Sequence, residues 1–194
     1  LKNSSVESII LHLWTFEIPE ATYEAIGQNY ENLKSLKITL GTRHSVNFFA
    51  KAFPNLESLS VKFGEANNRV EFAQVFDADN EVSQSKLKSL SLRFWGSEEL
   101  TGDGLFKILK GFANLEKLHI HSKFAFSADF INQLADKLNT IKVIKLSSFA
   151  IRNSETFAAE TVDALKALRS KVNYVHLSLS NIEEVDFGQG LPDN

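Results

Sequence analysis

The feature that most constrains the fold is a six-residue pattern, apolar-x-x-apolar-x-apolar, which recurs seven times in the 194-residue chain. The copies are VESIIL from Val6, LKSLKI from Leu33, LESLSV from Leu56, LKSLSL from Leu87, LEKLHI from Leu115, IKVIKL from Ile141 and VNYVHL from Val172. Successive copies begin 27, 23, 31, 28, 26 and 31 residues apart. Such a period indicates a repeat protein in which each unit is one supersecondary element.

Hydrophobic residues alternate within each copy, as Leu36, Ile38 and Leu40 do, and this period of two is typical of a strand. Between copies the period lengthens to that of an amphipathic helix. The expected helical stripes are Tyr23, Ile26 and Tyr30 after Pro19; Val46, Phe49, Ala50 and Phe53 after Ser45; a shorter stretch at 69–77; Leu105, Ile108, Leu109 and Phe112 after Thr101; Phe130, Ile131, Leu134 and Leu138 after Ser127; and Phe157, Val162, Leu165 and Leu168 after Ser154.

Each unit is therefore predicted to run strand, turn, helix and return, and one unit alone cannot bury its apolar face. Stacked units with right-handed crossovers give an α/β solenoid with seven parallel strands on the concave side and helices on the convex side. We expect one repeat array over residues 1–194, with 182–194 as a C-terminal cap. Nothing comparable to a cap precedes Val6, so we expect a further N-terminal part beyond this sequence.

These units resemble leucine-rich repeats of the longer, helix-bearing kind found in ribonuclease-inhibitor-like and F-box-associated arrays. The stretch SEELTGDGLFKILKGFANLEKLHI, from Ser97 to Ile120, carries the resemblance best, and it extends from Val6 to about Ile182. The family places Asn or Cys three residues after the last strand leucine, whereas this chain has Gly41, Gly64, Trp95, Lys123, Phe149 and Ser180 there, so the array is divergent. The resemblance implies a horseshoe and a substrate-recognition arm of a ubiquitin ligase.

If the leucines point into the core, the residues between them line the concave face. That face would hold no Asp or Glu, although the chain has 24 of them, and it would hold four of the five histidines. Strand spacing gives it a length of about 29 Å. The candidate partner-binding residues are Lys37, Lys62, Arg93, Lys117, His119, His121, Lys145, Tyr174 and His176. The alternative is that Lys, Ser and Thr simply keep exposed strand positions soluble.

The basic face predicts a non-catalytic interaction module, a scaffold or recognition arm, that binds an acidic or phosphorylated protein segment. Alternatives are a structural subunit of a larger assembly, a receptor for a small anion such as an inositol phosphate, and an enzyme activator. Phe94-Trp95-Gly96 is either a ligand anchor or part of the core. As pH falls towards 6, we expect the four histidines to add positive charge to the face.

Several function classes are not expected. Without cysteine there is no disulfide framework, thiol nucleophile or Cys-bound zinc, and an intracellular location, cytoplasmic or nuclear, is favoured. No carboxylate accompanies His119 and His121 on their face, so we predict no metal, no cofactor and no catalytic histidine. A net charge of −3 does not suggest nucleic-acid binding, and no apolar run is long enough for a membrane helix.

Overall fold

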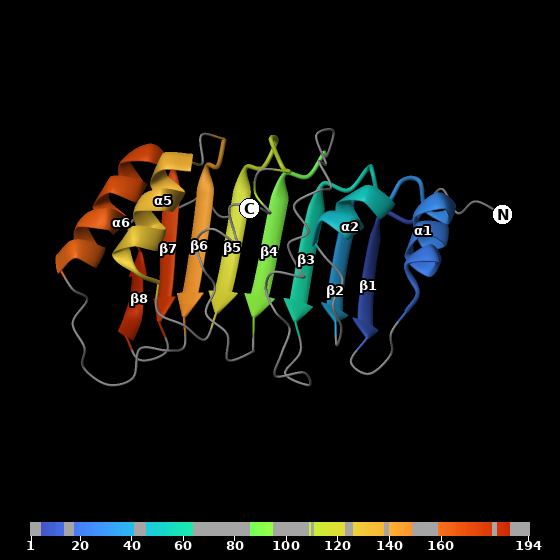
Figure 1. Cartoon of the computed structure of the whole chain (residues 1–194), viewed down its shortest axis with the longest axis horizontal. Helices are drawn as coiled ribbons and strands as arrows, with labels where there is room; N and C mark the ends of the chain where they lie inside the picture. Colours follow the sequence, from blue (N-terminus) through green and yellow to red (C-terminus); the bar gives the residue numbers. More distant parts are fainter. Residues whose placement is uncertain are drawn as a thin grey trace.

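The computed structural model describes residues 5–13, 18–40, 46–63, 86–94, 109, 111–122, 126–137, 140–148, 159–179 and 182–186. Its strands form one eight-stranded sheet in sequence order (Figure 1). They are β1 (Ser8–Leu13), β2 (Ser35–Leu40), β3 (Ser58–Phe63), β4 (Ser89–Phe94), β5 (Lys117–Ser122), β6 (Val143–Ser148), β7 (Tyr174–Leu179) and β8 (Ile182–Asp186). β1 to β7 are parallel, as the repeat predicted.

Four described helices run along one side of this sheet (Figure 1). They are α1 (Glu20–Asn29), α2 (Val46–Ala52), α5 (Ala128–Lys137) and α6 (Ala159–Lys171). Ser127 caps α5, since the Phe130 N–H donates to Ser127 Oγ at 3.1 Å. Pro19 is the N-cap of α1 and not part of its first turn, and its carbonyl accepts the Thr22 N–H at 2.9 Å.

The core lies between the sheet and the helices. The hydrophobic residues that alternate along each repeat strand all point towards the helices. Two rows of aliphatic side chains cross β2 to β7, and all are 3% exposed or less. The rows are Leu36, Leu59, Leu90, Leu118, Ile144 and Val175, and Ile38, Val61, Leu92, Ile120, Leu146 and Leu177. The helices add Tyr23, Phe49, Ile131, Leu134, Leu165 and Leu168 to the same cluster. The predicted strand phase is therefore confirmed.

Two local contacts show how closely neighbouring units pack. The rings of Phe63 and Phe94 stack with centroids 5.1 Å apart, which places Phe94 in the core. Gly27 of α1 lies against α2, where an added Cβ would collide with the carbonyl oxygen of Ala52. A side chain at this position would therefore force the two helices apart.

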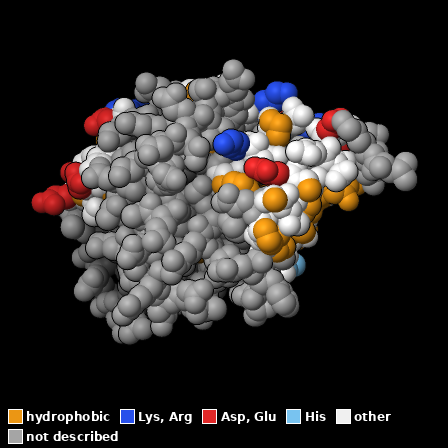
Figure 2. All heavy atoms as spheres, turned by 45° about the vertical axis from the view of Figure 1, so that its right-hand side comes forward, with side chains coloured by type: hydrophobic (Ala, Val, Ile, Leu, Met, Phe, Trp, Pro, Cys, Tyr) orange, Lys and Arg blue, Asp and Glu red, His pale blue; other side chains and the backbone are white. Residues whose placement is uncertain are grey.

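The β1 end of the sheet differs from its middle. Ile9 and Leu11 are only partly buried, whereas their partners Leu36 and Ile38 on β2 are fully buried. Ile10, on the other side of β1, is 59% exposed. Figure 2 brings this end forward and shows hydrophobic side chains grouped on its surface. The reason is that β1 pairs only with β2, so no neighbouring unit covers its outer edge among the described residues.

The other end is closed by a strand that the sequence did not predict. Residues 182–194 were expected to form a cap, but Ile182–Asp186 pairs with β7 as the antiparallel strand β8. The register joins His176 to Asp186, Leu177 to Val185 and Leu179 to Ile182, with an irregularity between Leu177 and Leu179.

Several predicted positions lie outside the described residues. They are Ser45, 69–77, Thr101, Leu105, Ile108, Leu138, Ser154, Phe157, 187–194, Trp95, Gly96 and the other five turn positions Gly41, Gly64, Lys123, Phe149 and Ser180.

Candidate functional site

The side of the sheet opposite the buried leucines, here called the polar face, carries three rows of side chains. Parallel register aligns them across β1 to β7. The first row is Ser8, Ser35, Ser58, Ser89, Lys117, Val143 and Tyr174. The second is Ile10, Lys37, Ser60, Ser91, His119, Lys145 and His176. The third is His12, Thr39, Lys62, Arg93, His121, Ser147 and Ser178. All nine predicted partner-binding residues therefore lie on one face.

Register concentrates most of the predicted residues in two adjacent groups. Lys62, Arg93 and His121 are direct neighbours in the third row, on β3, β4 and β5. His119, Lys145 and His176 are neighbours in the second row, on β5, β6 and β7. These six residues are called the basic cluster, and neighbouring strands about 4.8 Å apart place it within about 20 Å.

Two predicted cations fall outside the basic cluster. Lys37 lies between Ile10 and Ser60 in the second row, and Lys117 lies between Ser89 and Val143 in the first. Each of β2 to β6 thus carries one Lys or Arg on this face, whereas β1 and β7 carry none.

Long hydrogen bonds position three histidines on this face. His119 Nε2 lies 3.4 Å from Ser147 Oγ, and His12 Nδ1 lies 3.3 Å from Thr39 Oγ1. His176 Nδ1 lies 3.4 Å from the Tyr174 hydroxyl, and the two rings stack with centroids 6.3 Å apart. Tyr174 therefore orients a histidine of the basic cluster at its β7 end.

The basic cluster disfavours further positive charge. Burial lowers the pKa of His121 to about 4, with contributions from the charges of Arg93, His119 and Lys62. Burial also lowers the pKa of His119, together with Lys145, Arg93 and His176. The prediction that all four histidines gain charge towards pH 6 is therefore wrong for His121, whose pKa lies well below that pH. Both hold their neutral form to a lower pH than a free imidazole.

Carboxylates are scarce on the polar face but not wholly absent from its margin. The polar-face positions of β1 to β7 carry neither Asp nor Glu. The unpredicted strand β8 brings Asp186 into register with His176, so an acidic residue stands at the far edge of the basic cluster. Four strand spacings, about 19 Å, separate β8 from Arg93 on β4. Lys62, Arg93 and His121 are thus the part of the cluster farther from Asp186.

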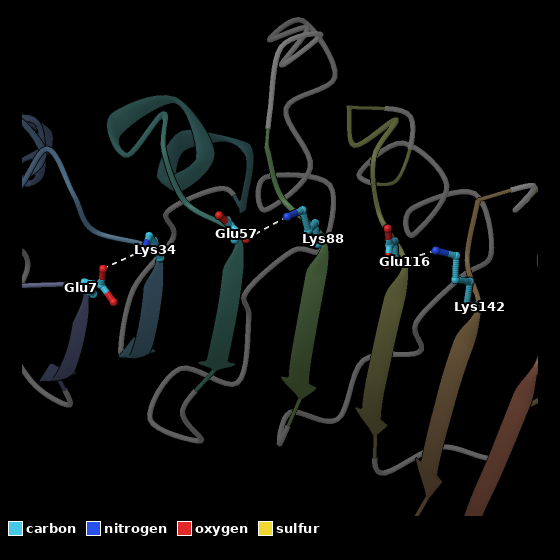
Figure 3. Close-up of polar contacts among 6 residues, drawn as sticks. All are labelled: Glu7, Lys34, Glu57, Lys88, Glu116 and Lys142. Atoms are coloured by element: carbon cyan, nitrogen blue, oxygen red, sulfur yellow. Dashed lines mark hydrogen bonds and ion pairs between the residues drawn. The ribbon is translucent and has the colours of Figure 1, made fainter. Parts of the chain in front are cut away.

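A second charged feature lies at the start of the strands, and sequence reasoning missed it. The second residue of each repeated pattern belongs to a series called the edge row: Glu7, Lys34, Glu57, Lys88, Glu116, Lys142 and Asn173. Its charge alternates in sign over the first six copies, and the seventh copy has the neutral Asn173. Ion pairs join Glu7 to Lys34 at 2.7 Å, Glu57 to Lys88 at 3.0 Å and Glu116 to Lys142 at 3.3 Å (Figure 3). This alternation of charge can be seen in the sequence when the seven copies of the pattern are aligned.

The edge row is also where the backbones of successive units first join. The Glu7 carbonyl accepts N–H groups from Lys34 and Ser35, each at 2.9 Å, and the same double acceptance repeats at every unit up to Lys142. The hydrogen bond between Lys34 and Glu7 raises the pKa of the Lys34 ammonium. The hydrogen bond between Lys88 and Glu57 lowers the pKa of the Glu57 carboxyl. Charge and backbone pairing thus favour the same register.

The turn before the strand uses a second short motif, aromatic-x-Asn-Leu. The carbonyls of Tyr30, Phe53 and Phe112 accept the N–H of the leucine three residues later, at 3.0 to 3.1 Å. Asn55 Nδ2 donates to the Glu31 carbonyl at 2.9 Å, and Lys86 Nζ donates to Asn55 Oδ1 at 2.7 Å. These bonds connect turns of neighbouring units before each strand.

Two open hollows lie away from the polar face. One, of about 750 Å³, lies between α1 and α2 and is lined by Tyr30, Phe48 and Phe53 among others. The other, of about 630 Å³, follows the edge row past Lys86, Lys88, Lys142 and Lys171. Three of those four lysines face carboxylates, since Lys171 pairs with Asp136 at 2.7 Å in addition to the two edge-row pairs.

The described residues give little support to a metal site or a membrane-spanning helix. In the part of the chain that the structure describes, no three His, Asp or Glu side chains are grouped so that they could hold a metal ion. Within the same residues no helix is both long and apolar enough to cross a bilayer.

The chain matches no model of a known protein family and no curated protein.

Proposed function

We propose that the chain is a leucine-rich-repeat-like solenoid that binds an acidic or phosphorylated segment of a protein partner on its polar face, without catalysis. The polar face would be the concave side of the horseshoe, with the helices on the convex side. Seven in-register parallel strands and helices on the opposite face support this geometry. Shallow, long sheet faces of repeat arrays suit extended binding surfaces.

The observation that carries the proposal is the unbalanced charge of the polar face. Lys37, Arg93, Lys117 and Lys145 form no ion pair with another described residue, whereas edge-row lysines pair with glutamates. Cations left without carboxylates attract an external anion, and the planar guanidinium of Arg93 suits two oxygens at once. Serine hydroxyls between the cations add donors and acceptors.

This partner would be an acidic protein segment and not nucleic acid, because the chain as a whole has a net charge of −3. The family resemblance favours a recognition arm or scaffold in an intracellular, cytoplasmic or nuclear, setting. The absence of cysteine favours the same setting.

The proposal is tested by capturing partners from a cell lysate on immobilised protein and identifying them by mass spectrometry. The variant reverses Lys62, Arg93 and Lys117 to glutamate. Its matched control reverses Lys51, Lys86 and Lys166, three exposed lysines off the polar face, so that both variants change charge equally. We expect partners to be lost from the first variant alone. Equal retention by both variants would contradict the proposal.

The open β1 edge favours a second candidate, a structural subunit of a larger assembly. Ile10 is 59% exposed, and Ile9 and Leu11 are less buried than their counterparts on β2. An exposed edge strand with apolar side chains is a site where another strand can add. In that case Ile10→Lys would abolish assembly in size-exclusion chromatography, and the polar-face reversals would leave it intact.

A further inference from the structure

We propose that Lys62, Arg93 and His121 form a binding site for a phosphomonoester dianion on the polar face. This inference rests on the proposed function and specifies which anion the face takes and where. The ligand chemistry is a phosphate ester with two negative charges, carried either by a phosphorylated residue or by a free polyol phosphate.

The geometry suits one tetrahedral oxyanion. The three residues are neighbours in register on β3, β4 and β5, so two strand spacings, about 10 Å, cover the group. Three terminal oxygens can then accept hydrogen bonds from an ammonium, a guanidinium and an imidazole that come from different strands. Ser60 and Ser91 occupy the next row beside Lys62 and Arg93 and add hydroxyl donors.

The charge of the surroundings favours a dianion over a single carboxylate. Among the described residues, the groups near His121 include Lys62 from β3, Arg93 from β4, His119 from its own strand and Ser147 from β6. Lys145 on β6 and His176 on β7 lie beyond His119, and Asp186 of β8 stands opposite His176. Arg93 and Lys145, which form no ion pair with another described residue, bring two positive charges, and a dianion can match both where one carboxylate cannot.

Anion binding at this site must be coupled to the protonation of His119 and His121. The positive neighbours are one cause, after burial, of the low pKa values of His121 and His119. A bound dianion offsets those charges, raises both pKa values and gains a charged donor when the imidazole is protonated. By linkage, binding then strengthens as pH falls through the raised pKa of the complex. A phosphomonoester loses charge below its own second pKa of about 6, so sulfate isolates the histidine contribution.

The first experiment follows the imidazole signals of His119 and His121 by NMR in chloride, sulfate and phosphate buffers of equal ionic strength. At about pH 5.5, His121 is neutral in chloride because its pKa is about 4. We expect sulfate and phosphate to shift its signal towards the protonated position in a saturable way. An unchanged signal in both anions would overturn the proposal.

Two double variants locate the effect. Lys62→Gln with Arg93→Gln removes two charges inside the site, and Lys37→Gln with Lys117→Gln removes two charges from the same face outside it. We expect the first pair to weaken phosphate binding by about tenfold or more, from two lost charge-assisted contacts, and the second to change it much less. Equal weakening would mean diffuse attraction and would overturn the site.

The ligand class is separated by comparing O-phosphoserine, aspartate and inositol hexakisphosphate in the same titration. O-phosphoserine should saturate the site at lower concentration than aspartate. If aspartate binds equally well, the phosphomonoester assignment is wrong, while partner loss in the lysate experiment would still support the proposed function. Saturation by inositol hexakisphosphate far below the concentration needed for O-phosphoserine would assign the site to a free polyphosphate, and similar concentrations would assign it to a phosphorylated residue.

Discussion

Positive side chains occur at regular positions in two regions of the same repeat units, the edge row just before each strand and the polar face of the strand, and their neighbours differ. In the edge row every lysine adjoins a glutamate of a neighbouring unit, and Lys88 stands between two, Glu57 and Glu116. On the polar face Arg93, five residues further along β4, stands between Lys62 and His121. A structural cation has a neighbour that neutralises its charge, whereas a cation available to a ligand does not. Exposure alone does not distinguish the two.

The physical origin of the difference lies in the repeat. Parallel units in register bring each position next to the same position of the next unit, so a repeated charge stacks on itself. Alternation of sign solves this problem in the edge row, where the backbones of the units also join. On the polar face the cations are not alternated with acids, and that arrangement costs stability unless a ligand supplies the negative charge.

The largest expected effect tests the strand phase on which both regions depend. Leu90→Ala or Leu118→Ala removes a side chain that is at most 1% exposed, and we expect a loss of about 2–5 kcal/mol in the free energy of unfolding. Ser91→Ala, on the polar face, should change it by about 0.5 kcal/mol or less. Denaturant unfolding measures all three. If Leu90→Ala cost no more than Ser91→Ala, the phase would be wrong by one residue.

The next effect compares two equal charge reversals in one repeat unit, at Lys88 just before β4 and at Arg93 within β4. Lys88→Glu places three acidic side chains in succession in the edge row and should lower Tm. Arg93→Glu removes a charge that repels Lys62 and should leave Tm unchanged or raise it. Thermal unfolding at low and high salt measures the difference, which salt should reduce. Equal losses of Tm would remove the distinction between the two regions.

A smaller effect concerns pH. The folded pKa of His121 is about 4, below the unfolded value of about 6.5, so the unfolded chain binds a proton that the folded chain does not. His121 therefore makes stability fall as pH decreases from about 6.5 to about 4. In His121→Gln that part of the pH dependence of Tm should be flatter. An identical pH profile in both proteins would show that His121 titrates normally.

The smallest effect isolates one neighbour of that histidine. Burial is the largest cause of the low pKa of His121 and Arg93 is the next. Arg93→Gln should therefore raise the pKa of His121 but leave it below the ordinary value of about 6.5. NMR titration of the imidazole measures this shift. The same change in Lys117, which lies in another row, should have little effect and serves as the control.

Local periodicity was sufficient to predict the seven parallel strands and their buried sides, because alternation within six residues decides both. The edge row could have been predicted but required alignment of copies 23 to 31 residues apart, since no single copy shows the alternation. β8 was missed because Ile182–Asp186 lacks the repeated pattern and pairs antiparallel.

The candidate site was less predictable than the fold. The nine residues could be assigned to one face, yet their grouping into the basic cluster depends on register between units. The pKa values of His119 and His121 depend on burial and on charges from four other strands, so the sequence suggested a gain of charge near pH 6 that His121 does not show.

The most direct test of the central claim measures partner capture by Lys88→Glu and Arg93→Glu alongside their Tm values. The two variants carry the same charge change in the same repeat unit, one in the edge row just before β4 and one on the polar face of β4. We predict that Lys88→Glu is less stable but captures its partner normally below its Tm, and that Arg93→Glu is fully stable but captures much less. Normal capture by Arg93→Glu, or loss of capture by both variants at full stability, would contradict the claim that the unbalanced polar face is the binding surface.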